Sequence, residues 1–415
     1  MKKRSWKQQI LTTQTLLATV DIGKAQNFGY YRCPDGTDVP AFRFANDGEG
    51  FKKFWQRLTH AMQQYGLTEV VVGFESTGSY AEPLMHFLRK HGARLVQVSP
   101  AHVKRVKELT DNSPNKTDEK DPKVIANIIA LGGALTVVIP QGAAAELRRL
   151  SQARERTLEE RTARYNQLHS VVFLVFPEFL EIFPKLDRKS VHDLLENYPT
   201  PAQLLGLTLE ELTQRLRRLS RGRWQGPQAE ALYSAAQNSV GVFEGQHSLV
   251  LEIQHLLRQI DGCDETIMTL ETHMRTHLAQ IPYSRFLQSL RGIGTVTLAG
   301  LIGEVGDFNN FKTVDELLKY AGLNLYEISS GEHKGQRRIS KRGRSLMRKL
   351  LYLAALNVVR QGGILHARYQ SYLAHGMVKL KALIAICRKL LGIMLALVRT
   401  QCEYRANYHA VVQLT

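Results

Sequence analysis

The chain has 415 residues, enough for two or three domains, and 44 % of them are hydrophobic, which excludes an intrinsically disordered protein. The net charge of +17 favours a polyanionic partner, most often nucleic acid. The four cysteines are far apart and form no C-x-x-C pair, so they indicate neither a disulfide framework nor a zinc site.

No segment of the sequence is expected to enter a membrane. The late apolar run Leu390–Val398 is too short to span a bilayer. Residues 1–15 begin with the basic M-K-K-R, and Gln14 and three threonines interrupt the apolar part that follows. We therefore interpret residues 1–15 as a basic arm and not as a signal peptide, and we expect a reducing, cytoplasmic environment.

Residues 16–140 show the pattern of an α/β domain. The expected strands are Leu16–Ile22, Phe28–Cys33, Ala41–Ala45, Val70–Phe74 and Ala93–Val98. The expected helices are Gly50–Tyr65, Tyr80–His91 and Pro122–Leu131. Short meandering strands followed by helix–strand units are typical of a mixed sheet.

Acidic residues stand where elements of this domain end or begin. Asp21 and Glu75 close two buried strands, whereas Asp118 and Asp121 lie three residues apart beside the start of the last helix. Residues at this spacing share one helix face. Mg²⁺ prefers carboxylate oxygens, and acids from separate elements can converge on one or two metal ions that clamp a phosphodiester. The four acids thus predict a magnesium site on a ribonuclease-H-like sheet.

Each acid also has a plainer interpretation. Asp21 could simply end its strand, Glu75 could cap the turn that follows it, and the acidic pair could complement a helix dipole. In a chain of net charge +17 the four acids together favour the metal site, because unpaired carboxylates crowded together would repel one another.

Residues 141–280 are expected to form a helical spacer. Long amphipathic patterns cover Ala143–Val175 and Leu249–Leu278. They flank a helical insert near residues 176–245. Two long helices around an insert predict an antiparallel coiled coil between two functional domains.

The insert itself has two local signals. A capping box is expected at Thr208–Glu211, where a helix should begin. A basic segment follows at Arg215–Arg223. These signals predict helices but give the insert no role.

Residues 281–415 are expected to form a mostly helical domain. Its expected helices are Phe286–Leu290, Val296–Val305, Val314–Tyr320, Ser345–Val359 and Val378–Val398, with a loop at Ala321–Arg344. The turn at Arg291–Thr295 looks like a helix-hairpin-helix turn. In such a turn Gly292 and Gly294 would let backbone N–H groups approach a DNA phosphate. A plain helix–helix turn fits these residues equally well.

A serine loop opens a long basic stretch. Residues 333–402 contain no acid and fifteen lysines and arginines. The loop Ser329–Gly331 precedes a cluster of cations, namely Lys334, Arg337, Arg338, Lys341, Arg342 and Arg344. A serine beside a glycine can approach a substrate closely while guanidinium groups hold phosphate oxygens. Taken alone, an S-S-G loop is more often a flexible turn.

Several motifs resemble those of the DEDD transposases and recombinases of bacterial insertion sequences, a family that includes Piv-type DNA invertases and RNA-guided serine recombinases. The motifs are V-D-I-G-K at Val20–Lys24, E-S-T-G-S-Y at Glu75–Tyr80, K-T-D-E-K-D at Lys116–Asp121, R-G-I-G-T-V-T from Arg291, A-G-L at Ala321–Leu323, S-S-G, and R-I-S-K-R-G-R-S-L-M-R-K-L-L at Arg338–Leu351. The match excludes the insert. It departs from the family at Pro122, where an alanine is usual, and at Asn324-Leu325, where T-P is common.

The resemblance implies a RuvC-like, ribonuclease-H-like amino-terminal domain whose acids Asp21, Glu75, Asp118 and Asp121 hold Mg²⁺. It also implies a carboxy-terminal transposase domain in which Ser330, and not Ser329, is the nucleophile. DNA would then be cut and rejoined through a phosphoserine link.

The resemblance further implies partners. Family members are guided by a structured RNA, encoded by the element, that pairs with donor and target DNA. They form dimers and then tetramers, so that the acids and the serine can come from different subunits. We therefore expect a nucleoid-associated bacterial protein that contacts nucleic acid through Arg291, Gly292, Gly294 and the cluster of cations.

Two other functions fit parts of the pattern. A metal-dependent nuclease or resolvase of the same fold would hydrolyse DNA without a covalent intermediate, and Ser330 would only contact a phosphate. A non-catalytic nucleic-acid-binding protein would lose nothing on substitution of Asp21. The presence of all four acids argues against this last alternative.

Overall fold

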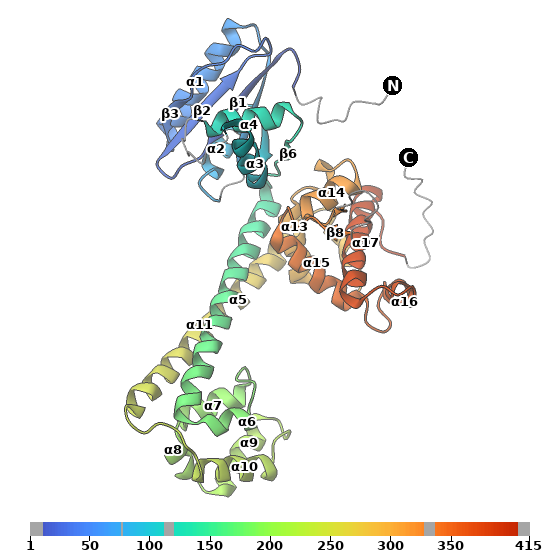
Figure 1. The fold of residues 1–415 in the computed structure, drawn as a ribbon. Helices are drawn as coiled ribbons and strands as arrows, with labels where there is room; N and C mark the ends of the chain where they lie inside the picture. Colours follow the sequence, from blue (N-terminus) through green and yellow to red (C-terminus); the bar gives the residue numbers. More distant parts are fainter. Residues whose placement is uncertain (1–10, 76–77, 112–119, 328–336, 406–415) are drawn as a thin grey trace. The chain divides into compact units, whose positions relative to one another are not determined.

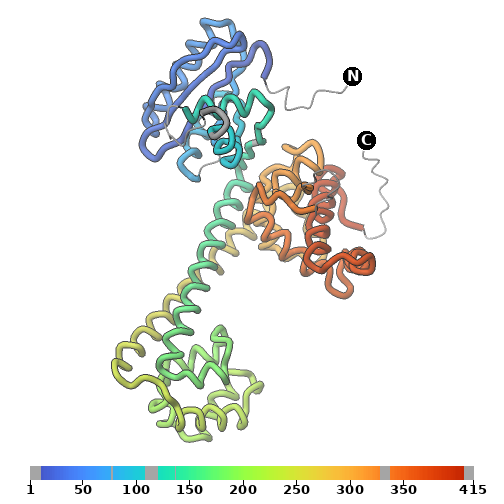
Figure 2. Tube along the Cα trace, in the orientation of Figure 1, coloured from blue at the N-terminus to red at the C-terminus, as the bar shows by residue number. Residues whose placement is uncertain are grey.

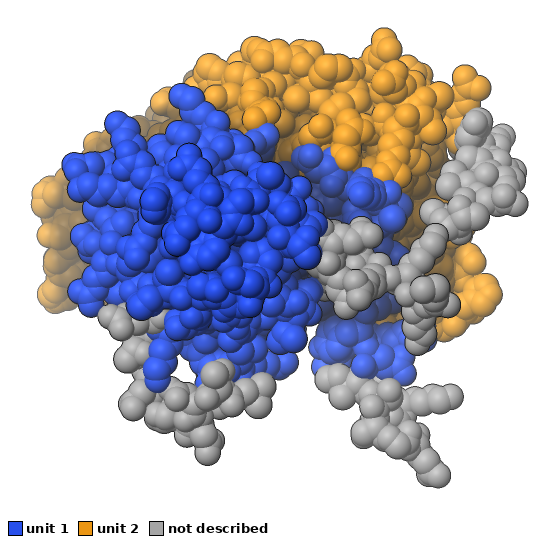
Figure 3. Space-filling model, turned by 90° about the horizontal axis from the view of Figure 1, so that it is seen from above, with its two compact units in different colours: residues 1–139, 310–345 blue, residues 140–309, 346–415 orange. Residues whose placement is uncertain are grey.

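The computed structural model describes residues 11–75, 78–111, 120–327 and 337–405. The chain divides into two compact units, which Figure 3 colours separately. Unit 1 comprises residues 1–139 and 310–345, and unit 2 comprises residues 140–309 and 346–415. Within the described ranges, no helix has both the length and the apolar character that crossing a bilayer requires.

Unit 1 is built on a six-stranded mixed sheet in the order β3-β2-β1-β4-β5-β6 (Figure 1). The strands are β1 (Thr15–Asp21), β2 (Gln26–Arg32), β3 (Phe42–Ala45), β4 (Glu69–Glu75), β5 (Arg94–Val98) and β6 (Leu135–Thr136). Strand β4 runs parallel to β1 and β5, whereas β2 is antiparallel to β1 and β3. The predicted mixed α/β domain is confirmed. Strand β6 was not predicted, because two residues are too few to show alternation.

Helices cover both faces of this sheet. They are α1 (Gly48–Gln64), α2 (Glu82–Lys90), α3 (Pro100–Asp111) and α4 (Asp121–Ala130). Side chains of β1 alternate between the faces, so Leu16 and Val20 pack with α1 and α2 while Leu17 packs with α3 and α4. Helix α3 was not predicted, because among its described side chains only Val103 and Val106 are large apolar residues of the core.

The rest of unit 1 is a short helix and a small ribbon. Helix α14 (Val314–Ala321) matches the prediction, and Thr313 caps it by accepting a hydrogen bond from the Glu316 N–H. Two short antiparallel strands follow, β7 (Leu325–Tyr326) and β8 (Arg338–Ile339). The prediction of a loop over Ala321–Arg344 was therefore wrong at these strands. Each has only two residues, too few to show the alternation of apolar and polar residues that indicates a strand.

Unit 2 is organised around two long helices that pack side by side, α5 (Gly142–Val175) and α11 (Gln246–Ala279) (Figure 2). Two ion pairs link them, Arg154 with Glu271 and Arg161 with Asp264. Seven residues forward on α5 correspond to seven residues backward on α11, so the helices are antiparallel with a heptad spacing. The predicted antiparallel pair is confirmed.

The insert packs at one end of this pair, between Val175 of α5 and the start of α11. Its helices are α6 (Pro177–Ile182), α7 (Lys189–Asn197), α8 (Pro201–Leu205), α9 (Leu209–Leu219) and α10 (Gly226–Gln237). They share one apolar core with α5 and α11. The capping box predicted at Thr208–Glu211 is present at the start of α9.

The carboxy-terminal helices of unit 2 pack at the other end of the pair. They are α12 (Ser284–Gln288), α13 (Thr295–Val305), the single turn η2 (Phe308–Asn310), α15 (Ser345–Val358), α16 (His366–Ala374) and α17 (Lys379–Thr400). Helix α16 was not predicted, because none of its residues is buried and it has no apolar stripe.

Two glycines bring α13 close to α5. A Cβ at Gly303 would lie 2.5 Å from the backbone nitrogen of Arg148, and one at Gly300 would lie 2.8 Å from the Ser151 hydroxyl oxygen. The Arg148 guanidinium then donates to the carbonyl oxygens of Gly303 and Glu304, at 2.9 and 2.7 Å. Because these two glycines have no side chain, α13 can cross α5 at this short distance.

We predict that Gly303→Ala destabilises the protein by about 1–3 kcal/mol, because a backbone atom cannot move aside for the new methyl group. The control is Gly262→Ala in α11, where a Cβ would meet nothing within 4 Å. This control should raise stability by about 0.5–1 kcal/mol through helix propensity. Urea unfolding measures both, and equal stability of the two variants would contradict the prediction.

Candidate functional site

The ends of two neighbouring strands bring a pair of acids together. Strands β1 and β4 pair in parallel with Val20 opposite Phe74, so the next residues, Asp21 and Glu75, are neighbours at the carboxyl edge of the sheet. Side chains alternate along a strand, so Asp21 shares the face of Thr19 and Glu75 the face of Gly73. Both carboxylates therefore belong to one face.

Helix α4 covers that face and brings a third acid. A Cβ on Gly73 would lie 2.2 Å from Cδ1 of Ile129, so the helix lies close to the sheet. The buried Thr19 hydroxyl donates to the carbonyl oxygen of Pro122 at 2.6 Å. This bond ties β1 to the first turn of α4, where Asp121 is the first helical residue.

Asp121 is nearly enclosed, with 5 % of its surface exposed. Its carboxylate forms an ion pair with the ammonium group of Lys107 on α3. The start of a helix also favours an anion, because the backbone N–H groups of the first turn point toward it. Lys107 thus balances the charge of this buried carboxylate, and a divalent ion that bound here would have to displace the ammonium group.

A polar network holds the other side of α4. The buried Tyr30 hydroxyl donates to Asp38 at 2.7 Å, and Arg32 joins Tyr30 to Asn127 of α4. Burial, and then the hydrogen bond to Asp38, raise the pKa of Tyr30 to about 12. The same hydrogen bond from Tyr30 lowers the pKa of Asp38. The ammonium nitrogen of Lys123 also lies 3.6 Å from a carboxylate oxygen of Asp38, which follows β2 in the sequence. Because Arg32 of β2 also binds Asn127, α4 is fixed to β2 as well as to β1.

The structure thus gathers three of the four predicted acids, Asp21, Glu75 and Asp121, on one face of the sheet. Asp118 lies outside the described residues. Among those residues, no set of three or more His, Cys, Asp or Glu side chains is close enough to hold a metal ion. The acids that are present offer the oxygen donors that Mg²⁺ prefers, and the four-acid site stays a prediction.

The predicted nucleophile lies, in the sequence, between two short paired strands, β7 and β8. We call residues 328–336, which connect them, the serine segment. Ser330, Ser329 and Lys334 lie outside the described residues, between β7 and β8. The strands pair Leu325 with Ile339 and Tyr326 with Arg338. Both ends of the serine segment are therefore attached to paired backbone.

Further bonds hold the base of this ribbon. The Ser340 N–H donates to the Asn324 carbonyl at 2.9 Å, and the Lys341 N–H donates to the Gly322 carbonyl at 3.0 Å. A Cβ on Gly343 would lie 2.4 Å from the Gly322 nitrogen. The return strand is thus held closely against the residues that follow α14.

The structure describes most of the predicted cations around this ribbon. Arg337 donates to the carboxylate of Glu327 at 2.9 Å, and its side chain is 74 % exposed. Arg338 lies in β8, and Lys341 adopts a left-handed conformation with φ of 54°. Nη1 of Arg342 lies 3.3 Å from Nε2 of His102 on α3. Unit 1 therefore carries cations before, within and after β8 in the sequence.

The predicted turn at Arg291–Gly294 lies in unit 2, between α12 and α13. Arg291, Gly292 and Gly294 are all exposed. Gly292 has φ of 96°, which favours glycine, and Gly294 is the residue before α13. The turn between two helices is present, as both interpretations of the sequence require, and the phosphate contact stays a prediction.

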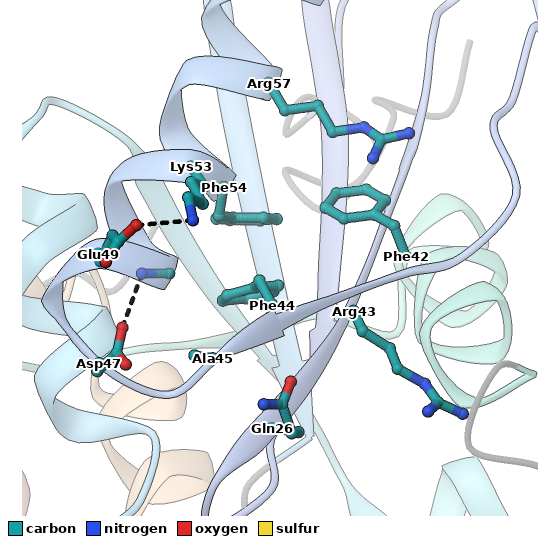
Figure 4. Close-up of a pocket in the computed structure, with 11 residues that line it drawn as sticks. Gln26, Phe42, Arg43, Phe44, Ala45, Asp47, Glu49, Lys53, Phe54 and Arg57 are labelled. Carbon is teal, nitrogen blue, oxygen red and sulfur yellow. Dashed lines mark hydrogen bonds and ion pairs between the residues drawn. The ribbon is translucent and has the colours of Figure 1, made fainter.

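The sequence did not predict a pocket at the free edge of the sheet (Figure 4). Its volume is about 360 Å³, and it lies between β3 and α1. The Arg57 guanidinium stands 3.9 Å from the centre of the Phe42 ring, and Lys53 pairs with Glu49 at 2.7 Å. Because β3 is separated from β1 by β2, this pocket is not part of the acidic site.

Two family models match separate segments of the chain. A family model described as a transposase, of the DEDD IS110 type, matches residues 18–177, which include all four acids. A second model, described as the transposase IS116/IS110/IS902 family, matches residues 284–370, which include Arg291, Ser330 and the cations.

Individual relatives agree with these models. The uncharacterized 43.6 kDa protein of insertion element IS110 from Streptomyces coelicolor is 24 % identical, over 95 % of this chain and 96 % of its own. The uncharacterized 44.8 kDa protein of IS116 from Streptomyces clavuligerus is 24 % identical, over 92 % and 94 %. The pilin gene-inverting protein of Moraxella bovis is 29 % identical, over 39 % of this chain and 46 % of its own.

We predict that Thr19→Val destabilises the protein by about 0.5–1.5 kcal/mol, because it removes the buried hydrogen bond from the Thr19 hydroxyl to the Pro122 carbonyl, which ties α4 to β1. Thr19→Ser keeps the hydroxyl and should retain most of the stability. Thermal unfolding compares the two variants with the unmodified protein. A Thr19→Val protein as stable as Thr19→Ser would show that this bond does not hold α4 to β1.

Proposed function

Because the chain belongs to the IS110/IS116 family of insertion-sequence transposases and is therefore a DNA transposase or recombinase, we propose that it cuts and rejoins DNA through a phosphoserine intermediate. The observation that carries the proposal is that Asp21 and Glu75 end neighbouring strands, while Asp121 stands at the start of the helix that is tied to β1. The strand order, with β2 antiparallel to its neighbours, supports a RuvC-like domain.

In this proposal Asp21, Glu75, Asp118 and Asp121 hold Mg²⁺. When bound, the ion neutralises charge on the phosphate oxygens of the scissile DNA and helps to orient them. The chain itself supplies the rigidity of the site, because the Thr19 hydrogen bond and the Tyr30 network fix α4 against the sheet. Lys107, which pairs with Asp121, balances the charge of that carboxylate in the metal-free protein.

Ser330 is the proposed nucleophile. Its Oγ attacks the scissile phosphorus, a bond between Oγ and phosphorus forms, and the bond from phosphorus to one deoxyribose oxygen breaks. The serine loses its proton and the released strand end gains one. Attack by a strand hydroxyl on the phosphoserine then reverses these changes and joins new partners. One ester bond replaces another at each step, so rejoining needs no external energy source.

The cations near the serine have a separate role. A neutral serine hydroxyl is a weak nucleophile, so the charge that develops on the phosphate oxygens must be stabilised. Arg338, Lys341, Arg342 and Arg344 follow the serine segment directly, and Lys334 and Arg337 lie within or beside it. We assign them to phosphate oxygens of DNA, and we assign Arg291, Gly292 and Gly294 to a second backbone contact.

We also propose a structured guide RNA and assembly into dimers and tetramers. The acid-free stretch of residues 333–402, with fifteen cations, supports a nucleic-acid surface larger than one active site needs. In such an assembly, we propose that the acids and Ser330 act together from different subunits.

The test is to trap a covalent protein–DNA adduct with DNA that carries the ends of the element. We expect the adduct with the unmodified protein and with Ser329→Ala, and its loss with Ser330→Ala. Asp21→Asn should also abolish it, because the scissile phosphate would lack its metal site. Denaturing gel electrophoresis followed by mass spectrometry of the modified peptide identifies the residue.

Two outcomes would contradict the proposal. An adduct that persists in Ser330→Ala would assign the nucleophile to another residue. DNA cleavage that survives Ser330→Ala without any adduct would instead support a metal-dependent nuclease.

A further inference from the structure

The insert carries a second concentration of positive charge, on the connection between α9 and α10. We call it the α9–α10 patch and define it as Arg217, Arg218, Arg221 and Arg223. The family models end at residue 177 and resume at residue 284, so neither assigns a role to this part of the chain. The patch therefore requires its own explanation.

The arginines of the patch are available to a partner. All four are exposed, and none forms an ion pair with a described residue. Arg215, one helical turn earlier, behaves differently, because its guanidinium binds Asp193 through two bonds of 2.6 and 2.9 Å and covers the Tyr198 ring. The fold thus uses Arg215 for its own stability and leaves the four later arginines at the surface.

The connection that presents them is well fixed. The Trp224 N–H donates to the Ser220 hydroxyl at 2.8 Å, and the Gly222 N–H donates to the Arg217 carbonyl at 2.8 Å. Arg221 has φ of 53°, a left-handed conformation that costs a non-glycine residue free energy. Asparagine or glycine would fit this position better, so an arginine here has a conformational cost.

A neighbouring segment extends the positive surface. The Arg188 guanidinium lies 5.3 Å from the centre of the Trp224 ring. Lys185 and Lys189 flank Arg188 in the sequence and are exposed, with Asp187 as the acid between them. The segment and the patch together present seven cations.

We propose that this surface binds the sugar–phosphate backbone of a double-helical nucleic acid. Exposed guanidinium groups on a rigid turn match phosphate oxygens, which give most of the contacts in such complexes. Binding of unpaired bases would need a free aromatic face. The Trp224 ring does not offer one, because its centre lies 4.5 Å from the centre of the Phe183 ring and the Arg188 guanidinium lies over it. The inference relies on the proposed function only in taking nucleic acid as the partner.

The position of the patch within unit 2 suggests what it contributes. It belongs to the end of the α5–α11 pair opposite to α13, which crosses α5 near Ser151. The stretch of α5 from Ser151 to Val175 is about 35 Å long at 1.5 Å per residue. That length equals about ten base pairs, at 3.4 Å per base pair. The patch would therefore contact the nucleic acid on the order of one helical turn away from the contact proposed for Arg291, Gly292 and Gly294, which precede α13.

The test combines Arg217→Gln, Arg218→Gln, Arg221→Asn and Arg223→Gln in one full-length variant, with asparagine chosen to suit the left-handed residue. Affinity for a duplex DNA and for a duplex RNA of equal length is measured over a range of salt concentrations. The logarithm of the binding constant falls as the logarithm of the salt concentration rises, and each lost phosphate contact makes this dependence shallower by about 0.9 on duplex DNA. The loss of four contacts should therefore reduce the steepness of the slope by about 3–4. The duplex that shows this drop is the natural partner class.

A matched variant controls for net charge by removing four exposed cations of unit 1, Lys52→Gln, Arg57→Gln, Lys90→Gln and Arg94→Gln. Its slope should stay close to that of the unmodified protein. An unchanged slope in the patch variant, or an equal drop in both variants, would overturn the inference. Unfolding curves confirm that the patch variant is folded, and Arg215→Gln should lower stability without changing the slope.

This test is independent of the nucleophile. A patch variant that binds normally while the Ser330 adduct still forms would reject the patch and keep the proposed function. A reduced slope in a protein that never forms the adduct would keep the patch and reject the phosphoserine.

Discussion

The parallel pairing of β1 with β4 is the constraint on which the candidate site depends. Its register makes Asp21 and Glu75 neighbours, and the alternation of side chains sends both carboxylates to the face that α4 covers. The Thr19 hydrogen bond to Pro122 then sets where α4 begins, and so where Asp121 lies. A shift of one residue between the strands would separate the two acids and turn one of them to the opposite face.

The rest of the chain extends this site in two ways. The strands β7 and β8, which precede and follow the serine in the sequence, pair as a ribbon, and Arg338 belongs to its second strand. The antiparallel helices α5 and α11 carry the insert to the far end of unit 2, where a second basic surface forms. The acids, the proposed nucleophile and the proposed remote backbone contact thus belong to separate segments of the chain, as expected for an enzyme that must hold long nucleic acids while it exchanges strands.

Much of the fold could be predicted from the sequence, and the elements that were not predicted were missed for physical reasons. Long elements with a clear period were found, from the buried strand of β1 to the helix that ends at Val175. Helix α16 has no buried face and β6 has two residues, so neither shows a pattern. For the site, Asp21 and Glu75 followed from strand ends. The ion pair of Lys107 with Asp121 did not, because it joins α4 to a helix whose apolar pattern is weak.

The central claim is that acids from β1, β4 and the start of α4 share a divalent metal ion. The most direct measurement is anomalous X-ray scattering from a crystal of the full-length protein soaked in Mn²⁺, an oxygen-seeking substitute for Mg²⁺. We predict a strong peak at coordination distance from the carboxylates of Asp21 and Asp121, with Lys107 released from its ion pair. Peaks only at other sites, with Lys107 still bound to Asp121, would contradict this account.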